Sequence, residues 1–353
     1  MNKNLILTSN ISHAVPTATT EPRRINPSLI WALLGAAFIS LELFVVWNWV
    51  SSDNFRPIPV DPGSVPQFTK DVIHVLEWVM PTITAFVVWK FLILQSIKER
   101  QLTTDGMLVI TWLFLWFQDP MGNLITTQLL YSSYWFNMGS WTLGSMPGWI
   151  SPNGNNLPEP VLVMGFGYLW LGFAGSVIAC AGMRWVKNRY PRVSNLELAL
   201  VALVICIFLN DTGEVLLMMA GTYAWSAVIE EITLFYGTSY QLPLTEGILF
   251  PAVLAASALL RYYKDDKGMT IVERGLHRLQ IPSQARLMVK FLAIFGFMHL
   301  TMAVVYSIPM AWTSMYAAPS RTYPSHLVNN MCVSGIHNNQ CPGPGIAMPR
   351  PPY

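Results

Sequence analysis

Seven long apolar runs dominate this sequence of 353 residues and restrict what it can fold into. Each approaches the ~20 apolar residues that a helix needs to cross about 30 Å of hydrocarbon. Only 11% of the residues are charged, against about 25% in ordinary soluble domains. The sequence therefore predicts an all-α, polytopic membrane bundle of about seven transmembrane helices. The runs cover residues 29–50, 72–95, 106–128, 160–182, 196–220, 245–263 and 289–312.

The basic residues alternate between the loops that join these runs. Of the 21 Lys and Arg, 17 fall in the N-terminal segment, near the 96–105 loop, or in segments 183–195 and 261–290. The remaining loops and the C-terminal tail hold only Arg56, Lys70, Arg321 and Arg350. Under the positive-inside rule, this pattern places the N-terminus in the cytoplasm and the C-terminus outside.

Three regions follow from this pattern. Residues 1–28 form a polar cytoplasmic segment without an early apolar stretch, so we expect no cleavable signal peptide. Residues 29–315 form the membrane domain, and 316–353 form a Pro/Gly-rich tail. Within the membrane domain, 118–159 has no Lys or Arg but many aromatic and turn residues, which favours a folded outer cap.

The four cysteines are too few for a disulfide scaffold. Cys180 and Cys206 lie in apolar runs and are expected to pack as core residues. Cys332 and Cys341 share the tail and could pair if it faces an oxidising compartment.

Carboxylates inside the apolar runs are the strongest functional signal. A charge near the middle of a bilayer costs roughly 2.5–3.5 kcal/mol even on the lenient insertion scale. At 1.5 Å per residue, most of these acids fall at about one level, roughly 20 Å from the inner surface. We therefore expect a layer of acids in the outer half of the membrane. The candidate catalytic residues are Asp119, Asp211, Glu214, Glu42 and Glu77.

Asp211 and Glu214 form the most suggestive pair. They are three residues apart, so they share one helix face. Two carboxyl groups desolvated together do not both ionise easily, and one of them should keep its proton near neutral pH. Such a group suits general acid catalysis beside an ionised base.

Other polar and aromatic residues are candidates for substrate binding. Each also has a structural interpretation, because aromatic rings commonly pack, histidines commonly make structural hydrogen bonds, and acids at span ends commonly face the interface. No His pair at helical spacing and no Cys/His cluster occurs, so we expect no metal and no cofactor. The binding candidates are Trp112, Trp116, Tyr134, Trp149, Glu159, Glu246, His299 and His74.

Three stretches of the sequence resemble the spirocyclase AveC-like membrane family of bacterial polyketide pathways. The first is Phe117-Gln118-Asp119-Pro120 followed by YSSYWFNMGSW at 131–141. The second is PGWISP at 147–152, followed by Pro158-Glu159-Pro160, and the third is YQLPL at 240–244 with Glu246. With the pattern of spans, the resemblance covers roughly residues 30–315.

The resemblance implies a membrane enzyme that closes or dehydrates oxygen heterocycles, as in spiroketal formation from a dihydroxyketone. From the residues we expect Asp211 or Glu214 to be the acid, and Asp119 the base or cation stabiliser. The expected partners are the bilayer and a hydrophobic polyketide or isoprenoid substrate, in a bacterial plasma membrane, with no nucleic acid. A transmembrane terpenoid cyclase would need the same residues. A proton-coupled transporter remains a further alternative.

Overall fold

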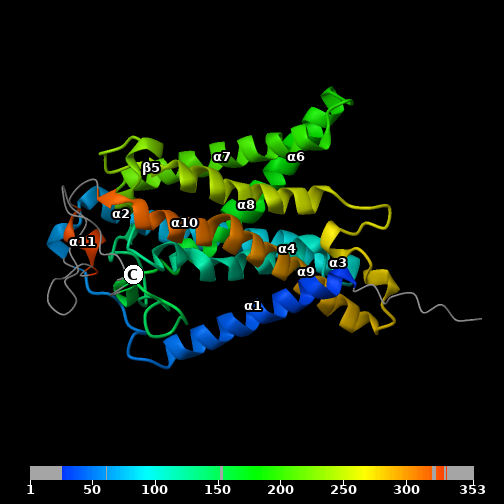
Figure 1. Cartoon of the computed structure of the whole chain (residues 1–353), viewed down its shortest axis with the longest axis horizontal. Coiled ribbons are helices and arrows are strands. Elements are labelled where there is room, and N and C mark those ends of the chain that lie inside the picture. The colour runs from blue at the N-terminus through cyan, green and yellow to red at the C-terminus, as the bar shows by residue number, and fades with distance from the viewer. Residues whose placement is uncertain (1–25, 61, 152–153, 320–322, 330, 332–353) are drawn as a thin grey trace, which may run out of the picture.

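The computed structural model describes residues 26–60, 62–151, 154–319, 323–329 and 331. Long helices run roughly parallel and form the body of the molecule, and short strands gather at one end (Figure 1). The predicted segments 1–28 and 316–353 lie mostly outside the described residues, as do Cys332 and Cys341. Cys180 and Cys206 are buried.

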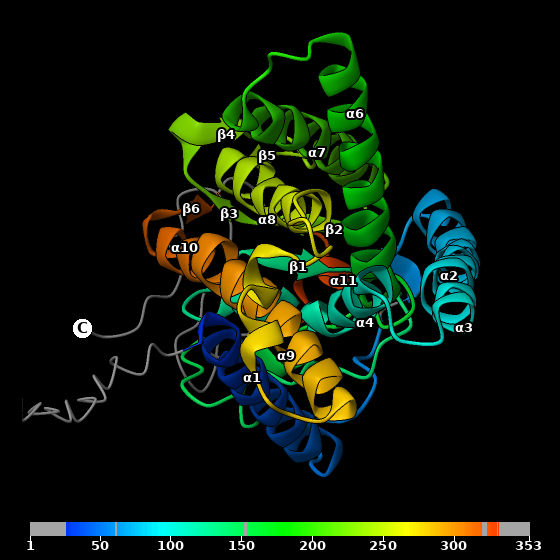
Figure 2. The same cartoon turned by 90° about the vertical axis from the view of Figure 1, so that its right-hand side faces the viewer.

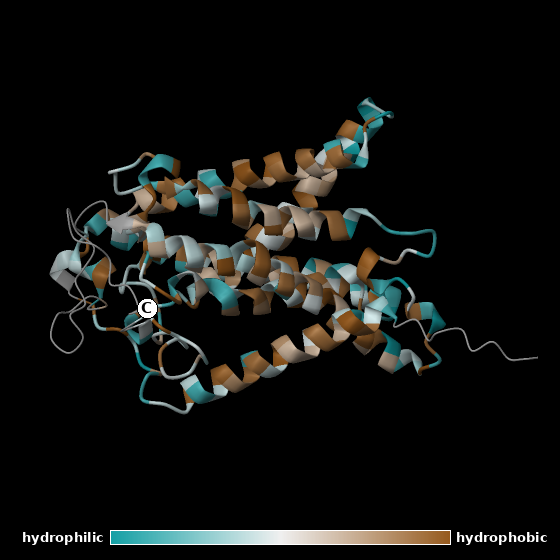
Figure 3. Cartoon of the chain, viewed as in Figure 1, coloured by the Kyte–Doolittle hydropathy of each residue, from teal (hydrophilic) through white to brown (hydrophobic). Residues whose placement is uncertain are grey.

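Six helices in the described part of the chain are long and apolar enough to cross a membrane. A chain in lipid must satisfy its backbone hydrogen bonds internally, and a helix does so within one segment. Figure 3 shows apolar residues along the helix shafts and polar residues at both ends. The prediction of a helical membrane bundle is confirmed, and the chain is an integral membrane protein.

Three of these six helices are uninterrupted, and three contain a π-helical segment. The uninterrupted ones are α1 (Pro27–Val50), α7 (Asn195–Met219) and α8 (Leu244–Tyr262). The second span joins α2 (Gln67–Val87), the π-helix η2 (Val88–Ile93) and α3 (Leu94–Glu99). The third joins α5 (Met164–Gly167), the π-helix η5 (Tyr168–Ala174) and α6 (Gly175–Arg189). The last joins α9 (Ser283–Thr301), the π-helix η9 (Met302–Ser307), α10 (Ile308–Thr313) and the 3₁₀-helix η10 (Ser314–Tyr316).

The expected span at 106–128 takes a different form. It is an α-helix, α4 (Thr104–Leu115), that tightens into a 3₁₀-helix, η3 (Trp116–Asn123). Polar residues at both ends make this helix less apolar than the other six. End-on, α4 lies among α6, α9 and the α2–α3 helix (Figure 2). The described part therefore has six apolar spans and a seventh, mostly buried helix that packs against the second, third, fifth and last of them.

Close backbone contact joins the first and last spans. A Cβ added to Gly35 of α1 would lie 2.0 Å from the carbonyl oxygen of Leu292, and one added to Gly296 of α9 would lie 2.3 Å from the carbonyl oxygen of Trp31. Only glycine allows this approach, as in other membrane helix pairs with small residues at the crossing.

Three antiparallel strand pairs connect the loops at one end of the bundle. β1 (Leu129–Tyr131) pairs with β2 (Tyr223–Trp225). β3 (Ala227–Val228) pairs with β6 (Ala318–Pro319), and β4 (Thr233–Leu234) pairs with β5 (Leu242–Pro243). The first pair joins the 118–159 segment to the loop after α7. Short helices lie at Pro62–Ser64, Gly154–Asn156, Glu230–Ile232, Ile271–Glu273, Leu276–Arg278 and Ser325–Val328.

The two ends of the bundle differ in charge. The loops after α3, α6 and α8, which carry most of the basic residues, lie at the end where α1 begins (Figure 1). Asp105 of α4 and Arg261 of α8 form a two-point ion pair near this end, with N–O distances of 2.9 and 2.8 Å. A cytoplasmic position for this end remains a prediction of the positive-inside rule.

Candidate functional site

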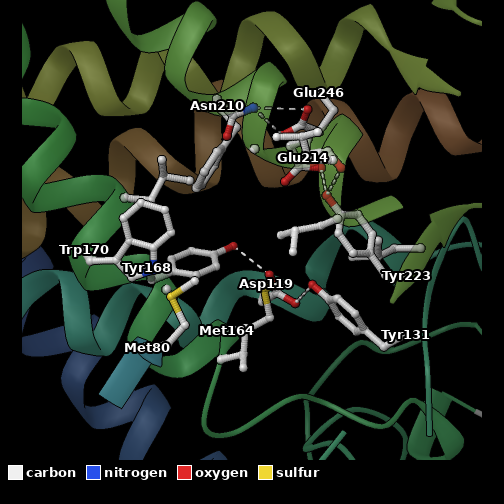
Figure 4. Close-up of a pocket in the computed structure, with 18 of the residues that line it drawn as sticks. Met80, Asp119, Tyr131, Met164, Tyr168, Trp170, Asn210, Glu214, Tyr223 and Glu246 are labelled. Atoms are coloured by element: carbon white, nitrogen blue, oxygen red, sulfur yellow. Dashed lines mark hydrogen bonds between the residues drawn. The ribbon is translucent and has the colours of Figure 1, made fainter. Parts of the chain in front are cut away.

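A cavity of about 260 Å³ lies in the bundle beside the β1–β2 pair (Figure 4). Its wall is largely apolar and aromatic, with a few polar groups facing one another across it. Pockets of this kind are the default location for small-molecule chemistry. Residues from nine elements line it: Met80, Asp119, Leu129, Tyr131, Val163, Met164, Gly167, Tyr168, Trp170, Leu171, Asn210, Gly213, Glu214, Leu216, Leu217, Tyr223, Trp225, Glu246, Phe250 and Tyr306.

Asp119 is held between two tyrosines (Figure 4). The hydroxyl of Tyr131 donates to Oδ2 at 2.8 Å, and that of Tyr168 donates to Oδ1 at 2.9 Å. The 3₁₀ turn of η3 places this carboxyl group, which is 7% exposed, at the cavity wall. Hydrogen bonds donated to a carboxylate favour its charged form. Asp119 is therefore the carboxyl group of the cavity best placed to act as a base or to balance a cation.

Glu214 faces Asp119 across the cavity and has one phenol partner. The hydroxyl of Tyr223 donates to Oε2 of Glu214. Tyr223 and Tyr131 are cross-strand partners in the β1–β2 pair, and their rings lie 5.8 Å apart. One strand pair therefore positions one phenol against each of the two opposed carboxyl groups.

Glu246 supplies a third carboxyl group from the first turn of α8. The amide nitrogen of Asn210 donates to its two oxygens at 3.2 and 3.4 Å. Both side chains are buried, and the amide also reaches Oδ1 of Asp211 at 3.3 Å. Asn210 thus fixes the position of Glu246 from the neighbouring helix α7.

Two π-helical segments each bring a tyrosine to the cavity. Tyr168 opens η5, and Tyr306 lies in η9. Phe250 packs between them, with ring centroids 5.5 Å from Tyr168 and 5.2 Å from Tyr306. π-Helical turns inside α-helices often occur at functional sites because the extra residue redirects side chains.

Glu159 lies behind Asp119, in the loop that leads to α5. It is fully buried, and neither carboxyl oxygen has a hydrogen-bond partner of good geometry. Burial, reinforced by the negative charge of Asp119, raises the pKa of Glu159 well above its usual range. We expect Glu159 to be protonated at neutral pH, which lets Asp119 keep its charge.

The structure separates the two acids that share a helix face on α7. Glu214 lines the cavity, but Asp211 does not and lies against α8, where its Oδ2 would be 3.1 Å from a Cβ added to Gly247. Depth and helical spacing are alike for the pair, so only the packing of α8 distinguishes them.

Glu42 and His299 form a separate group. Oε1 of Glu42 lies 2.9 Å from Nδ1 of His299. Glu42 and the candidate Trp116 line a second cavity. The two cavities have no lining residue in common. Gln118, next to Asp119, donates to the backbone carbonyl of His299 at 3.1 Å.

The remaining candidates do not line the first cavity. Glu77 accepts from the backbone N–H of Phe136 at 2.6 Å, which anchors the 118–159 segment to α2. His74 and Tyr134 share a hydrogen bond of 3.3 Å near the same surface. The buried Trp112 donates to Ser257 at 3.0 Å.

Trp149 is the last candidate, and it lies in the 118–159 segment. It donates to the carbonyl of Ser151 at 2.7 Å and covers Gly154. Among the described residues, no group of three or more His, Cys, Asp or Glu side chains is placed to hold a metal ion.

The family described as spirocyclase AveC-like matches residues 99–327. The chain belongs to the spirocyclase AveC-like family. The match runs from the end of α3 into α11, so it contains both strands and all the carboxyl groups of the first cavity, and it begins after α1. No curated protein and no solved structure matches the chain.

The family assignment confirms the resemblance seen in the sequence, although the matched region starts later than the expected residue 30. Together with the six apolar helices, it supports a membrane cyclase of secondary metabolism.

Sequence reasoning missed the residues that hold the carboxyl groups in place. Tyr131, Tyr168, Tyr223 and Asn210 were not among the candidates. Asn210 could have been found, because it directly precedes Asp211 in a polar stretch of an apolar span. The tyrosines carried no comparable signal, since tyrosine is common at membrane interfaces.

Proposed function

We propose that the first cavity is the active site of a cyclase that closes an oxygen heterocycle by acid–base catalysis, with spiroketal formation as the reaction. The observation that carries the proposal is the pair of phenol-bound carboxyl groups, Asp119 and Glu214, on opposite walls of an apolar cavity. The family assignment supports ring closure as the reaction class.

The chemistry requires one acid and one base. One hydroxyl of a dihydroxyketone adds to the ketone and gives a hemiketal. Protonation of the hemiketal hydroxyl releases water and leaves an oxocarbenium ion. The second hydroxyl attacks that ion and gives up its proton, which forms the spiroketal. The enzyme donates one proton and recovers one, and the net change is the loss of one water.

The geometry favours Glu214 as the acid and Asp119 as the base. Glu214 faces the cavity, whereas Asp211, the other acid considered, does not line it. Asp119 accepts two phenol hydrogen bonds and Glu214 accepts one, so Asp119 is the better placed of the two to carry the negative charge beside a cation. Glu246 and Asn210 add a polar group that can orient a substrate oxygen.

A terpenoid cyclase is the second candidate. The rings of Trp170, Phe250 and Tyr306 line the same cavity and could stabilise a carbocation by cation–π attraction. In that reaction the acid would protonate an epoxide or olefin. The product separates the two candidates, because terpene cyclisation would give an oxygen-poor polycycle and not a ketal.

The substrate is proposed to be hydrophobic and to reach the cavity from the bilayer, and a bacterial plasma membrane is the proposed location. Apolar and aromatic side chains form most of the lining, which suits a polyketide or isoprenoid body. A proton-coupled transporter would instead move its substrate unchanged. Recovery of unaltered substrate from inside vesicles would support that alternative.

The decisive experiment compares Glu214→Gln with Asp211→Asn in purified protein. Both changes neutralise an acid on the same face of α7, but only Glu214 lines the cavity. Loss of the general acid should lower the rate of ketal formation by about 10²–10⁴-fold, and Asp211→Asn should retain most of the activity. Equal rates for both variants and wild type, measured by mass spectrometry on folded protein, would exclude the proposed acid.

A further inference from the structure

The first cavity opens to the outside of the bundle on one side. Its lining residues from η3, the β1–β2 pair, α2, α8 and η9 are all buried. Its partly or largely exposed lining residues all belong to α5, η5 and α7, and Leu216 of α7 is 60% exposed. Trp170 from η5 and Glu214 from α7 lie on different sides of the cavity (Figure 4). The opening between them, here called the lateral crevice, is lined by Met164, Gly167, Trp170, Leu171, Gly213, Glu214, Leu216 and Leu217.

The lateral crevice is a gap in the packing of the third and fourth spans. A Cβ added to Gly182 of α6 would lie 2.3 Å from Cδ1 of Ile205, so α6 and α7 touch there. Further along, α7 packs against α6 and α8 but not closely against α5 or η5. A Cβ added to Gly213 meets no atom within 4 Å, and one added to Gly167 meets only the indole of Trp170, at 3.7 Å. The two glycines therefore leave the crevice wide.

The crevice faces hydrocarbon. Leu216 and Met219, on the outer face of α7, are apolar and exposed, as in a span that contacts lipid. Among the described residues that line the crevice none is basic, and the one acid is Glu214, whose carboxyl group is bound by Tyr223. An alkyl chain can lie in such a gap, whereas a charged group at this depth would be unfavourable.

The cavity itself is small for a polyketide or isoprenoid substrate. Its volume of about 260 Å³ is below the roughly 300–1,000 Å³ of pockets that enclose drug-sized ligands. The opposed carboxyl groups of Asp119 and Glu214 require the reacting oxygens to lie inside it. A long chain attached to the reacting part must therefore leave the cavity, and the lateral crevice is the open side.

We propose that the substrate is an uncharged dihydroxyketone with a long apolar chain, and that this chain lies in the lateral crevice and extends into the lipid while the ring closes. The assignment of the reacting part rests on the proposed function of the first cavity. The chain stays in an apolar environment throughout, so binding does not require it to be transferred from lipid to water.

The first test measures binding and does not need turnover. The probe is a bicyclic spiroketal of two six-membered rings with a dodecyl chain that carries a diazirine in its first half. Purified protein in lipid nanodiscs is irradiated with the probe, and labelled peptides are mapped by mass spectrometry. We expect labelling of segments 164–171 and 213–219. Excess spiroketal without the chain should abolish it by filling the cavity, whereas labelling by probe merely dissolved in the lipid would persist.

The second test measures turnover of two dihydroxyketones that differ only in an ethyl or a dodecyl chain. The wild-type protein should convert both with similar kcat, because the chain lies outside the cavity. Gly213→Trp places a bulky ring in the crevice and should lower kcat/KM for the dodecyl substrate about tenfold more than for the ethyl substrate. Leu200→Trp, at a position of α7 that is 52% exposed and does not line the cavity, is the control and should match wild type.

The two tests separate the crevice from the reaction. Conversion without labelling of either segment, or a wild-type protein that converts the ethyl but not the dodecyl substrate, would overturn the crevice and leave the proposed function in place. Wild-type conversion of both substrates by Gly213→Trp would do the same. Labelling that the chainless spiroketal abolishes, without any conversion, would support the crevice and overturn the reaction. If Gly213→Trp does not fold, as judged by size exclusion, the competition and the chain-length comparison decide.

Discussion

Replacing Asp119 by Asn tests the proposed mechanism most directly. In the wild-type protein this carboxylate accepts phenol hydrogen bonds of 2.8 and 2.9 Å, one on each oxygen. Asparagine keeps the shape but offers only one acceptor, so one tyrosine loses its partner and the negative charge disappears. Loss of a general base costs about 10²–10⁴-fold in rate, or roughly 3–5 kcal/mol in activation free energy.

The two tyrosines give a graded version of the same test. Tyr168→Phe removes one of the two donors to Asp119. A hydrogen bond to a charged group contributes about 1.5–3 kcal/mol, so the rate constant should fall by roughly 10- to 150-fold. Because the phenol acts through Asp119, adding Tyr168→Phe to the Asp119→Asn variant should cost little more. Tyr316→Phe, at an exposed tyrosine outside the cavity, serves as the control.

The assay is multiple-turnover conversion of a dihydroxyketone in nanodiscs at saturating substrate, with the product measured by mass spectrometry and thermal unfolding measured on each variant. We expect kcat to fall in the order Tyr316→Phe, Tyr168→Phe, Asp119→Asn, with the control close to wild type. A folded Asp119→Asn variant with wild-type kcat would refute the role of this carboxylate. Additive losses in the double variant would show that Tyr168 acts independently of it.

Three further predictions concern space, packing and pH. Gly213→Leu should keep the protein folded, because a Cβ at this position meets no atom within 4 Å. It should lower the turnover of bulky substrates, because Gly213 lines the first cavity. Unchanged turnover would exclude this cavity as the active site. Gly296→Ala forces a Cβ to within 2.3 Å of the Trp31 carbonyl and should cost about 1–3 kcal/mol of stability in thermal unfolding. Gly175→Ala, whose Cβ meets no atom within 4 Å, should leave stability unchanged or raise it by up to about 1 kcal/mol, because alanine favours a helix over glycine. Glu159→Gln should stabilise the protein relative to wild type, by a margin that grows from pH 5 to pH 8. In the unfolded chain Glu159 loses its proton above its usual pKa of 4.5, whereas the folded protein keeps it, so wild-type stability falls as pH rises. A margin that does not change with pH would contradict the protonated state assigned to Glu159.

The helices were predictable because the membrane leaves few alternatives for an apolar backbone. Asp119 and Glu214 were also predictable as functional candidates, since a carboxyl group in an apolar run has a cost that needs an explanation. The form of the 106–128 segment was harder to predict. Its polar residues, such as Gln118 and Asn123, are compatible with a helix only because the other helices enclose it.

The placement of the acids around the bundle was not predictable. Glu42, Asp119 and Asp211 have nearly the same expected depth, yet Asp119 lines the first cavity, Glu42 lines the second and Asp211 lies against α8. Residue spacing gives the height of a side chain along its own helix. It does not give the rotation of that helix relative to its neighbours, which the packing of all the helices decides together.

The sequence by itself determined that this protein is a helical membrane bundle, which family it belongs to, and which carboxyl groups carry an energetic cost that calls for a function. Those properties depend on local composition and on short motifs such as Phe117–Pro120. Only the tertiary structure decided which acids face one cavity and which tyrosines hold them. Tyr131 and Tyr223 are 92 residues apart in the chain and meet through the β1–β2 pair. A contact between such distant segments depends on the whole fold, because no local pattern encodes it.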